Sequence, residues 1–533
     1  MLKLKLYIIL LTIIPCMGCA QKKETFPEKP NIIYIMTDDH ATNAIGTYGS
    51  RLASLNPTPN LDKLASEGMV FENCFVSNSI CTPSRATIIT GQYSQTNGVL
   101  DFSNGIDGDR QYLPIEMKKR GYETAIIGKW HLHEEPSAFD FYSVLEGQGK
   151  YFNPSFREKN KGEWPKNVVQ TTGHSTDVIT NKAIEWLSNR KDSQKPFMLM
   201  YQMKAPHDWF EYAPRYEDYL ADSKIPEPES LYHQPNWGSE GTRGKNDSLI
   251  DVIGSSVSNR HKFFNYVDKL KIDPNLSGDE ATSASYQKYL KKYLRCVKGI
   301  DDNIGKFIQY LKDNNLYDNT IIIYSSDQGM MLGEHDMVDK RWMYEESMKM
   351  PFIIKYNKLI KAGSRNETII NNTDYAPTII DLAGGHVPDY MQGKSIKPLL
   401  ENEQPDNWRT ASYYRYWLHL EHHDIPAHFG IRTKNYKLIF FYGRHWNLEK
   451  VGQRSRWWLP DDQSIKIGPT PPAWELYDLQ NDPYEVINVY NNPEYKDLVI
   501  SLKEEMKSQR ELYHETDANY PHIQKIIDEY WEK

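Results

Sequence analysis

Four apolar segments, each followed at once by polar or reactive side chains, constrain the fold of this chain most strongly. They cover residues 31–37, 122–128, 197–203 and 320–326. Short apolar runs of this kind are typical of strands buried on both faces of a parallel sheet. Because the carboxyl ends of parallel strands meet at one edge, the residues that follow these segments should come together there. The sequence therefore predicts an α/β fold with a candidate site at that edge.

Length and composition indicate one large domain and a smaller one. The chain has 533 residues, of which 39% are hydrophobic and 25% charged, an ordinary globular composition. The composition turns polar near residues 400–407, so we predict a main domain over 31–403 and an α+β subdomain over 404–533. We expect the subdomain to hold an antiparallel sheet with a helix packed on it. Its expected strands cover 411–417, 431–433, 437–442 and 475–478, and its expected helix covers 495–512.

The net charge limits the partners. A formal charge of −8 argues against a nucleic-acid-binding protein, which would neutralise phosphates with many basic side chains. It does not exclude a polyanionic substrate, since a local cationic pocket can form on an acidic protein.

The N-terminus has the pattern of a secretory signal. Two lysines precede an apolar run over residues 6–14, which is too short to span a membrane. The following Met-Gly-Cys resembles a bacterial lipobox and would make Cys19 the lipidated first residue, with cleavage without lipid as the alternative. We predict a lipoprotein signal peptide over 1–18 and a polar tether over 19–30. Export to the periplasm or outer membrane would follow, with the lipid as the only membrane contact.

Three cysteines fall in the part expected to fold, namely Cys74, Cys81 and Cys296. That number builds no disulfide framework. A bridge between Cys74 and Cys296 is compatible with an oxidising compartment, but nothing in the sequence requires it.

Carboxylates follow two of the four apolar segments. Asp38 and Asp39 follow the first, and Asp327 with the amide Gln328 follows the fourth. Neighbouring acids repel unless a cation neutralises them, and these side chains offer the oxygen ligands that Ca²⁺ prefers. An acidic loop is the alternative for either pair alone. Together at one sheet edge they predict a calcium site.

The segment from Cys81 to Gly91, Cys-Thr-Pro-Ser-Arg-Ala-Thr-Ile-Ile-Thr-Gly, predicts a short helix with a reactive first turn. Pro83 suits the first turn and Gly91 the C-terminal end of a helix. Cys81 would then lie where backbone N–H groups favour negative charge, with Arg85 one turn on as an oxyanion partner. A buried structural cysteine before an ordinary helix is the alternative.

Five motifs in this chain together resemble those of the formylglycine-dependent (type I) sulfatases. They are Cys81-Thr-Pro-Ser-Arg with Thr-Gly-Gln-Tyr, Asp38-Asp-His, Gly-Lys129-Trp-His, Lys-Ala-Pro-His207 and Asp-Lys340-Arg-Trp-Met-Tyr-Glu-Glu. They occur in the family's order between residues 31 and about 400. The resemblance implies the fold of the alkaline phosphatase superfamily: a large, mostly parallel sheet sandwiched by helices, with a small C-terminal antiparallel sheet.

The resemblance also implies a mechanism. A formylglycine-generating enzyme or an anaerobic sulfatase-maturating enzyme would convert Cys81 to formylglycine. One hydroxyl of the hydrated aldehyde would attack sulfur, and the other would later expel sulfate. His131 would serve the hydroxyl of residue 81, and His207 would protonate the leaving sugar oxygen. Arg85, Lys129 and Lys340 would form a cationic cage around the sulfate.

The implied metal is one Ca²⁺ ion. Its ligands would be Asp38, Asp39, Asp327, Gln328 and the modified Cys81. Many sulfatases carry Asn where this chain has Gln328, which is a departure, although Gln also supplies a carbonyl oxygen.

The expected substrate is a sulfated oligosaccharide from a glycosaminoglycan, mucin or other sulfated glycan. The motifs look most like those of N-acetylglucosamine-6-sulfatases, with galactose or N-acetylgalactosamine 4-O-sulfatases close behind. Two competing functions are that of a phosphonate or phosphodiester hydrolase of the same superfamily and that of a catalytically silent glycan-binding lipoprotein. The residues proposed to contact sugar are His133, Arg415, His423 and His428.

Overall fold

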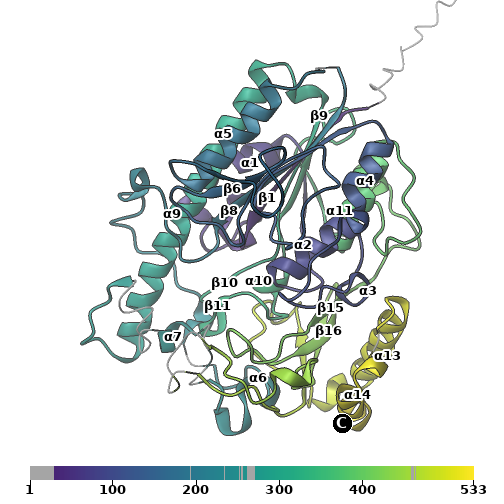
Figure 1. Cartoon of the computed structure of the whole chain (residues 1–533). Coiled ribbons are helices and arrows are strands. Elements are labelled where there is room, and N and C mark those ends of the chain that lie inside the picture. The colour runs from purple at the N-terminus through teal and green to yellow at the C-terminus, as the bar shows by residue number, and fades with distance from the viewer. Residues whose placement is uncertain are drawn as a thin grey trace, which may run out of the picture.

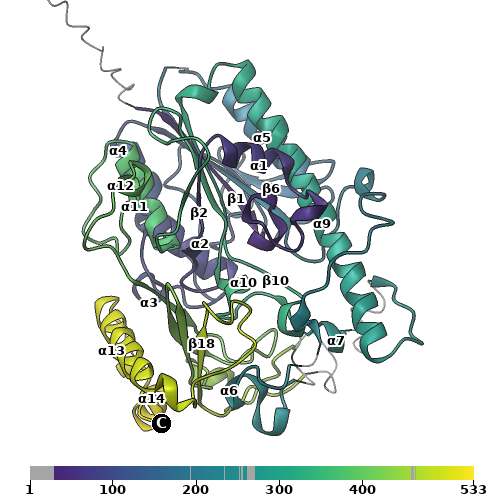
Figure 2. The same cartoon turned by 180° about the vertical axis from the view of Figure 1, so that it is seen from behind.

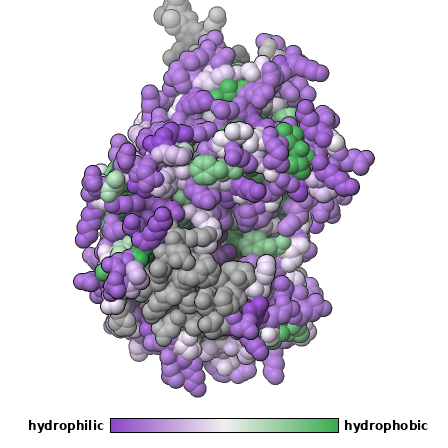
Figure 3. Space-filling view, turned by 60° about the vertical axis from the view of Figure 1, so that its left-hand side comes forward, coloured by the Kyte–Doolittle hydropathy of each residue, from purple (hydrophilic) through white to green (hydrophobic). Residues whose placement is uncertain are grey.

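The computed structural model describes residues 29–192, 194–232, 234–250, 253, 256–260, 270–457, 461, 464–515 and 517–533. The predicted signal peptide, Cys19 and nearly all of the predicted tether therefore lie outside the described residues. Within the described part, no helix combines the length and apolarity needed to cross a membrane. The face of the molecule drawn in Figure 3 is mostly hydrophilic and carries only small, separated hydrophobic patches.

A ten-stranded mixed sheet forms the centre of the larger part of the molecule (Figure 1). Its strand order is β13-β2-β12-β9-β1-β8-β4-β5-β6-β7, in which β13 covers Ser364–Asn366. Five neighbouring strands run parallel: β9 (Thr320–Ser326), β1 (Asn31–Asp38), β8 (Phe197–Pro206), β4 (Glu123–Gly128) and β5 (Phe141–Leu145). The outer strands include antiparallel pairs, made by β12 (Phe352–Lys355) with β9 and β2 (Met69–Phe71), and by β6 (Ser155–Glu158) with β5 and β7 (Val168–Gln170). The predicted α/β class and all four central strands are confirmed.

The register of these strands brings their carboxyl ends to one edge. Thr37 pairs with Ser326, and Asp38 pairs with Pro206 across a register shift. Gly128 pairs with Gln202 on the other side of β8. Gly128 has φ +109°, and a Cβ there would lie 1.7 Å from the Gln202 carbonyl oxygen, so only glycine fits this close approach. The segments that follow β1, β4, β8 and β9 therefore start side by side.

Helices cover both faces of the sheet (Figures 1 and 2). One face packs against α2 (Cys81–Thr90), α4 (Tyr112–Lys119) and α11 (Tyr375–Leu382). The other packs against α1 (Pro59–Ser66), α5 (Ser175–Ser188) and the 36-residue α9 (Gly278–Asp313). Side chains of β1 alternate between these two cores, with Tyr34 in the first and Ile35 in the second. A strand buried on both faces explains the continuous apolar run in its sequence.

A four-stranded antiparallel sheet follows, in the order β15 (Ala411–Tyr416), β16 (His428–Thr433), β17 (Tyr436–Phe441) and β18 (Ala473–Asp478). One of its faces belongs to the main core through side chains such as Tyr414 and Phe441. The opposite face packs under α13 (Lys496–Leu512) and α14 (Pro521–Tyr530) through side chains such as Tyr413 and Phe440. The smaller sheet therefore has two covered faces, as Figure 2 shows.

Some elements differ from the expectation. The segment 135–173, in which no strand was predicted, contributes β5, β6 and β7 to the large sheet. β6 has one buried residue and β7 has none, so these two strands lack the apolar run that marks the central strands. The strand expected over 431–433 begins earlier, at His428, and α14 was not expected.

The three described cysteines are buried and free. Cys74 Sγ lies 3.0 Å from the hydroxyl of Tyr375 in the core on one face of the sheet. Cys296 lies on α9 in the core on the other face. The disulfide considered between Cys74 and Cys296 is absent, because the sheet separates the two side chains.

Candidate active site

The helix that carries Cys81 starts at the edge where the central strands end. Cys81 is the first residue of α2, Ile80 is its N-cap, and Gly91 ends the helix with φ 67°. All ten residues of α2 are buried, and Pro83 occupies the first turn, where a backbone N–H has no partner within the helix. Cys81 Sγ lies 3.5 Å from Asp38 Oδ1. The side chain at position 81 therefore faces the carboxylates at the end of β1.

Three fully buried carboxylates converge there. Asp38 ends β1 and Asp39 follows it, Asp327 follows β9, and oxygen atoms from all three lie within 4.8 Å of one another. Burial and the nearby charge of Asp38 raise the pKa of Asp327 to about 7. Burial alone would also raise the pKa of Asp38, but Lys129, His207 and Arg85 lower it well below its usual range. Such a cluster of like charges is stable only beside positive charge.

Cationic side chains surround the carboxylates. Arg85 Nη2 lies 2.8 Å from Asp327 Oδ2 and 3.6 Å from Asp38 Oδ1. Lys129 donates to Asp38, and Lys340 Nζ lies 2.5 Å from Asp39 Oδ2. Arg85 was expected in a cage around the sulfate, yet its guanidinium faces Asp327 and it does not line the cavity. We infer that Arg85 positions the acids, whereas Lys340 faces the cavity.

The residues present fit a divalent cation with oxygen ligands. Gln328 donates its amide N–H to Asp39, while Gln328 Oε1 is buried and has no hydrogen-bond partner among the described residues. Burying a carbonyl oxygen that accepts no hydrogen bond costs free energy, unless an ion or a water molecule binds to it. This oxygen and the carboxylates of Asp38, Asp39 and Asp327 make the kind of oxygen set that Ca²⁺ takes.

His207, at the end of β8, is held by carboxylates on both sides. Its Nδ1 lies 2.7 Å from Asp208 Oδ1, and its Nε2 lies 3.8 Å from Asp39 Oδ2. Burial and Lys340 would lower the pKa of His207, but Asp38, Asp208 and Asp39 raise it to about 10. The imidazole is therefore a protonated group beside the Cys81 side chain, with which it lines one cavity.

The pKa of His131, which follows β4, is shifted in the opposite direction to that of His207. Burial together with the charges of Lys129 and Arg85 lowers its pKa well below the usual value. Its Nδ1 lies 3.4 Å from the hydroxyl of Thr82, the second residue of α2. A neutral imidazole here can accept a proton, while His207 can give one. Two histidines whose environments push their pKa values apart are typical of an acid–base pair.

A cavity of about 290 Å³ opens onto these groups. It is lined by four of the residues proposed as catalytic from the sequence, Cys81, His131, His207 and Lys340. The proposed sugar contact His423 also lines it, with Nδ1 4.0 Å from Asp339 Oδ2. The remaining lining residues are Phe102, Gln148, Asp208, Asp339, Arg341 and His422.

The other three proposed sugar contacts do not line this cavity. Arg415 is buried in ion pairs with Glu515 and Asp517, at 2.8 and 2.7 Å, because it lies on β15 facing the core under α13. His428 is fully buried among aromatic rings, and its Nδ1 bonds the backbone of Pro426. His133 is exposed near the His131 ring. For Arg415 and His428 the structure corrects the expectation of a sugar contact.

Several residues of the site were not predicted from the sequence. Asp208 and Arg341 directly follow the predicted His207 and Lys340, so adjacency was an available signal. Lys204 is 5% exposed behind the site, and burial next to Lys129 lowers its pKa to about 8. Gln148, which accepts from Lys129 Nζ at 2.5 Å, comes from the segment 135–173, in which nothing in the sequence singled it out.

The fold and this pocket together define an α/β enzyme whose candidate active site suits an anionic ester. The family model described as Sulfatase matches residues 30–385, and the one described as N-sulphoglucosamine sulphohydrolase, C-terminal, matches residues 333–453 and 464–512. The chain therefore belongs to the sulfatase family, whose members hydrolyse sulfate esters.

Two named relatives and one solved structure are similar to this chain over most of its length. An N-acetylglucosamine-6-O-sulfatase from Bacteroides thetaiotaomicron is 38% identical, over 93% of this chain and 89% of the relative. An ulvan-active sulfatase from Formosa agariphila is 28% identical, over 92% of this chain and 81% of the relative. A solved structure described as a complex with its substrate D-glucosamine-2-N,6-O-disulfate matches with TM-score 0.77 and 37% identity, over 92% of this chain and 99% of that chain.

Proposed function

We propose that this sulfatase removes the 6-O-sulfate from a terminal glucosamine unit, N-acetylated or N-sulfated, of a sulfated glycan. The observation that carries the proposal is the match along nearly the whole chain to the solved complex with a 6-O-sulfated glucosamine. The 38% identical relative has a name of the same specificity. The cavity is small and ends at Cys81, which suits one terminal sugar and an exo mode of action.

The proposal includes a formylglycine and one Ca²⁺ ion. Asp38, Asp39, Asp327 and Gln328 would hold the ion, which would supply positive charge to a sulfate oxygen and to the hydroxyl of residue 81. Formylglycine made from Cys81 would supply a hydroxyl nucleophile at sulfur. The place of residue 81, buried at a helix N-terminus beside Asp38, supports both assignments.

Side chains of the protein would bind the sulfate, transfer the protons and position the acids. Lys340 Nζ reaches the cavity from the side of Asp39 and can hold a sulfate oxygen. His207 is placed to donate a proton to the leaving sugar oxygen, because Asp208 holds its imidazolium form. His131 stays neutral and can accept the proton of the hydroxyl at residue 81. Lys129 and Arg85 keep the acids in place.

The sugar would be held by polar residues at the cavity mouth. Asp339 and Arg341 flank Lys340, form an ion pair with each other, and both line the cavity. Their backbones have φ 146° and 86°, an uncommon conformation that turns the segment around Lys340. A carboxylate and a guanidinium side by side suit neighbouring hydroxyls of one sugar ring. His423 extends this wall.

The test is turnover by protein co-expressed with a sulfatase-maturating enzyme, with the mass of the Cys81 peptide measured first. Formylglycine at residue 81 and calcium-dependent desulfation of N-acetylglucosamine 6-sulfate or glucosamine 2-N,6-O-disulfate are the expected results. Selective release from galactose or N-acetylgalactosamine 4-sulfate would instead favour the 4-O-sulfatase. Faster cleavage of a phosphonate monoester would favour the phosphoryl hydrolase, and binding of the sugar without turnover would indicate a silent binding protein.

We further propose that the protein is exported as a lipoprotein. The support is in the sequence alone: a basic start, a short apolar run and Met-Gly-Cys ending at Cys19. Labelling with a palmitate analogue should mark the wild-type protein and fail to mark a Cys19→Ala variant. Labelling that survives the substitution would contradict the anchor.

A further inference from the structure

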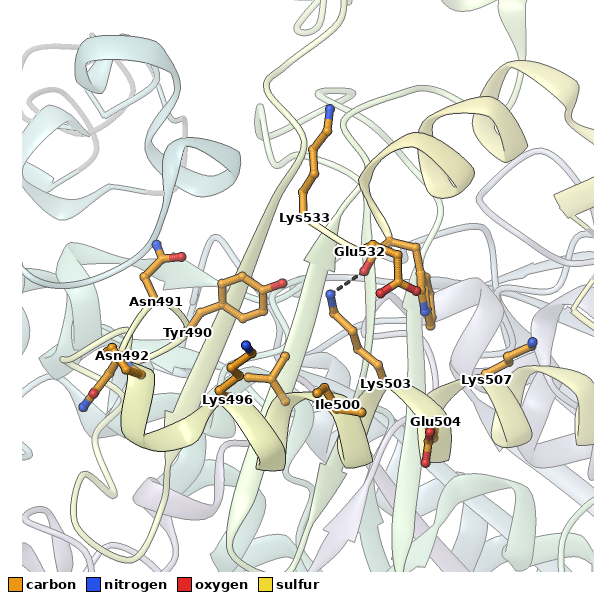
Figure 4. A pocket seen from close by; sticks show the side chains of 13 residues that line it. Tyr490, Asn491, Asn492, Lys496, Ile500, Lys503, Glu504, Lys507, Glu532 and Lys533 are labelled. Atoms are coloured by element: carbon orange, nitrogen blue, oxygen red, sulfur yellow. Dashed lines mark hydrogen bonds between the residues drawn. The ribbon is translucent and has the colours of Figure 1, made fainter.

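A second cavity, remote in sequence from the catalytic residues, lies along α13. It has a volume of about 710 Å³ and lies between α13, the loop before it and the last residues of the chain (Figure 4). α13 packs on the face of the small sheet that points away from the main core. The sheet therefore separates this groove from the catalytic cavity.

One face of α13 lines the groove with lysines. Lys496, Ile500, Lys503 and Lys507 are spaced by four, three and four residues, which places them in one stripe on the helix. From the first to the last lysine the helix rises about 16 Å. In Figure 4 Lys496 and Lys507 lie toward the two ends of this stripe, and Lys503 reaches across to the C-terminal segment. The spacing suits an extended ligand with several negative charges.

The balance of charge in the groove is opposite to that of the whole protein. Of the four lining lysines, Lys533 pairs with Glu529 at 3.2 Å, and Lys496, Lys503 and Lys507 face only two acids among the lining residues, Glu504 and Glu532, whereas the chain carries a formal charge of −8. Lys496 and Lys507 are exposed, and among the described residues neither forms an ion pair. Exposed lysines without acidic partners are available to an anionic ligand.

Aromatic rings give the groove a rigid wall. Tyr490 stacks on Trp474 at 5.9 Å with an interplanar angle of 8°, and Trp531 meets Trp474 edge-on at 5.4 Å. Lys503 Nζ lies 4.4 Å from the centre of the Trp474 ring and donates to the Trp531 carbonyl oxygen. Tyr490 and Trp531 thus line the groove in fixed positions, where their apolar faces can pack against sugar rings.

We propose that this groove binds a second segment of a sulfated glycan chain, through its lysines and aromatic rings, and holds the polymer to the enzyme apart from the terminal sugar being desulfated. Charge complementarity selects a polyanion, and the aromatic wall favours a polysaccharide over a small anion. The choice of a sulfated glycan rests on the proposed function. The binding itself does not need catalysis.

The test measures binding of a labelled, sulfated heparin oligosaccharide whose terminal sugars carry no 6-O-sulfate. A Cys81→Ala background prevents turnover, and saturating glucosamine 6-sulfate occupies the catalytic cavity. The double variant K496Q/K507Q should weaken binding at least fivefold and reduce its dependence on salt. The matched control K118Q/K119Q removes two exposed lysines from α4 and should change affinity less than twofold.

If both double variants weaken binding equally, the effect comes from net charge alone and the proposal is overturned. Unchanged binding by K496Q/K507Q would overturn it as well. With Cys81 matured, K496Q/K507Q should desulfate the monosaccharide at the wild-type rate. If the proposed sugar specificity is wrong, both proteins fail in that assay while the difference in polymer binding remains. The two failures are therefore distinguishable.

Discussion

His207 Nδ1 lies 2.7 Å from a carboxylate oxygen of Asp208, the residue that follows it in the chain. Of the three acids that raise the pKa of His207, only Asp208 is outside the proposed calcium ligands. A bound cation would offset the charges of Asp38 and Asp39, but it would leave this contact in place. Asp208 therefore has the main part in keeping His207 protonated when the site is complete.

An Asp208→Asn substitution should move the alkaline limb of the kcat/KM profile to lower pH. The imidazolium loses its carboxylate partner, so its pKa falls and the acid form is lost earlier as pH rises. The measurement is kcat/KM for the sugar sulfate across pH, with Glu211→Gln, an exposed acid nearby in sequence, as the control. An alkaline limb that does not move would contradict the role of Asp208.

His207→Gln should slow desulfation of a sugar by about 10²–10⁴. The loss should be much smaller for an aryl sulfate, because a phenolate leaves without needing a proton. Comparing kcat for glucosamine 6-sulfate and 4-nitrophenyl sulfate measures this difference. Equal losses on both substrates would mean that His207 is not the leaving-group acid. His131→Gln should slow both substrates alike, since a proton acceptor at residue 81 acts independently of the leaving group.

Calcium should stabilise the folded protein. A ligand at 100 times its Kd adds about 2.7 kcal/mol to the free energy of unfolding, and here it also relieves repulsion among three buried acids. Thermal unfolding with Ca²⁺ and with chelator measures the effect. Asp39→Asn should reduce the calcium-dependent shift, while Asp109→Asn, at an exposed acid, should leave it intact. An equal shift in wild type and Asp39→Asn would place the ion elsewhere.

The sequence located most of the candidate site because its residues follow strands with a simple physical signature. Burial on both faces forces a continuous apolar run, and parallel pairing brings the residues after each run to one edge, as with Asp38 and Asp327. The edge strands β6 and β7 lack that burial, so their extension of the sheet was not predicted.

The sugar contacts were harder to predict because they depend on loops from distant segments. Of the proposed sugar contacts, His423 lines the cavity, whereas His428 lies on β16, a strand that turns its side chain into the core. Arg415 was also proposed as a sugar contact, but its ion-pair partners Glu515 and Asp517 lie about 100 residues further along the chain. Nothing in the sequence around these residues distinguishes a side chain in the cavity from one buried in the core.

Arg341→Ala should raise KM for the sulfated sugar about 10- to 150-fold. This factor corresponds to the free energy of one hydrogen bond from a charged group. Turnover of 4-nitrophenyl sulfate should hardly change, because that substrate has no sugar hydroxyls. Steady-state kinetics on both substrates separates these effects. A proportional loss on the aryl sulfate would instead show that Arg341 acts on the sulfate or on Lys340.

Arg415→Met should destabilise the fold without altering specificity. The substitution leaves the buried carboxylate of Glu515 without its guanidinium partner, which costs about 3–5 kcal/mol, while Asp517 keeps its ion pair with Arg510. Chemical denaturation measures the loss. Lys434→Met, which removes an exposed pair with Glu367, should cost no more than about 1 kcal/mol. A raised KM for the sugar at a temperature where the variant is folded would restore Arg415 as a sugar contact.

The small sheet gives one of its faces to the core that surrounds α2, the helix of Cys81. Removing the C-terminal subdomain would uncover Trp342 and Tyr344, which lie just after Lys340 and contact the rings of Phe441 and Tyr477. The smaller subdomain is therefore no detachable module that could be lost or exchanged freely. Substitutions in the buried positions of its sheet should therefore require compensating substitutions around residue 81, because the two parts share one hydrophobic core.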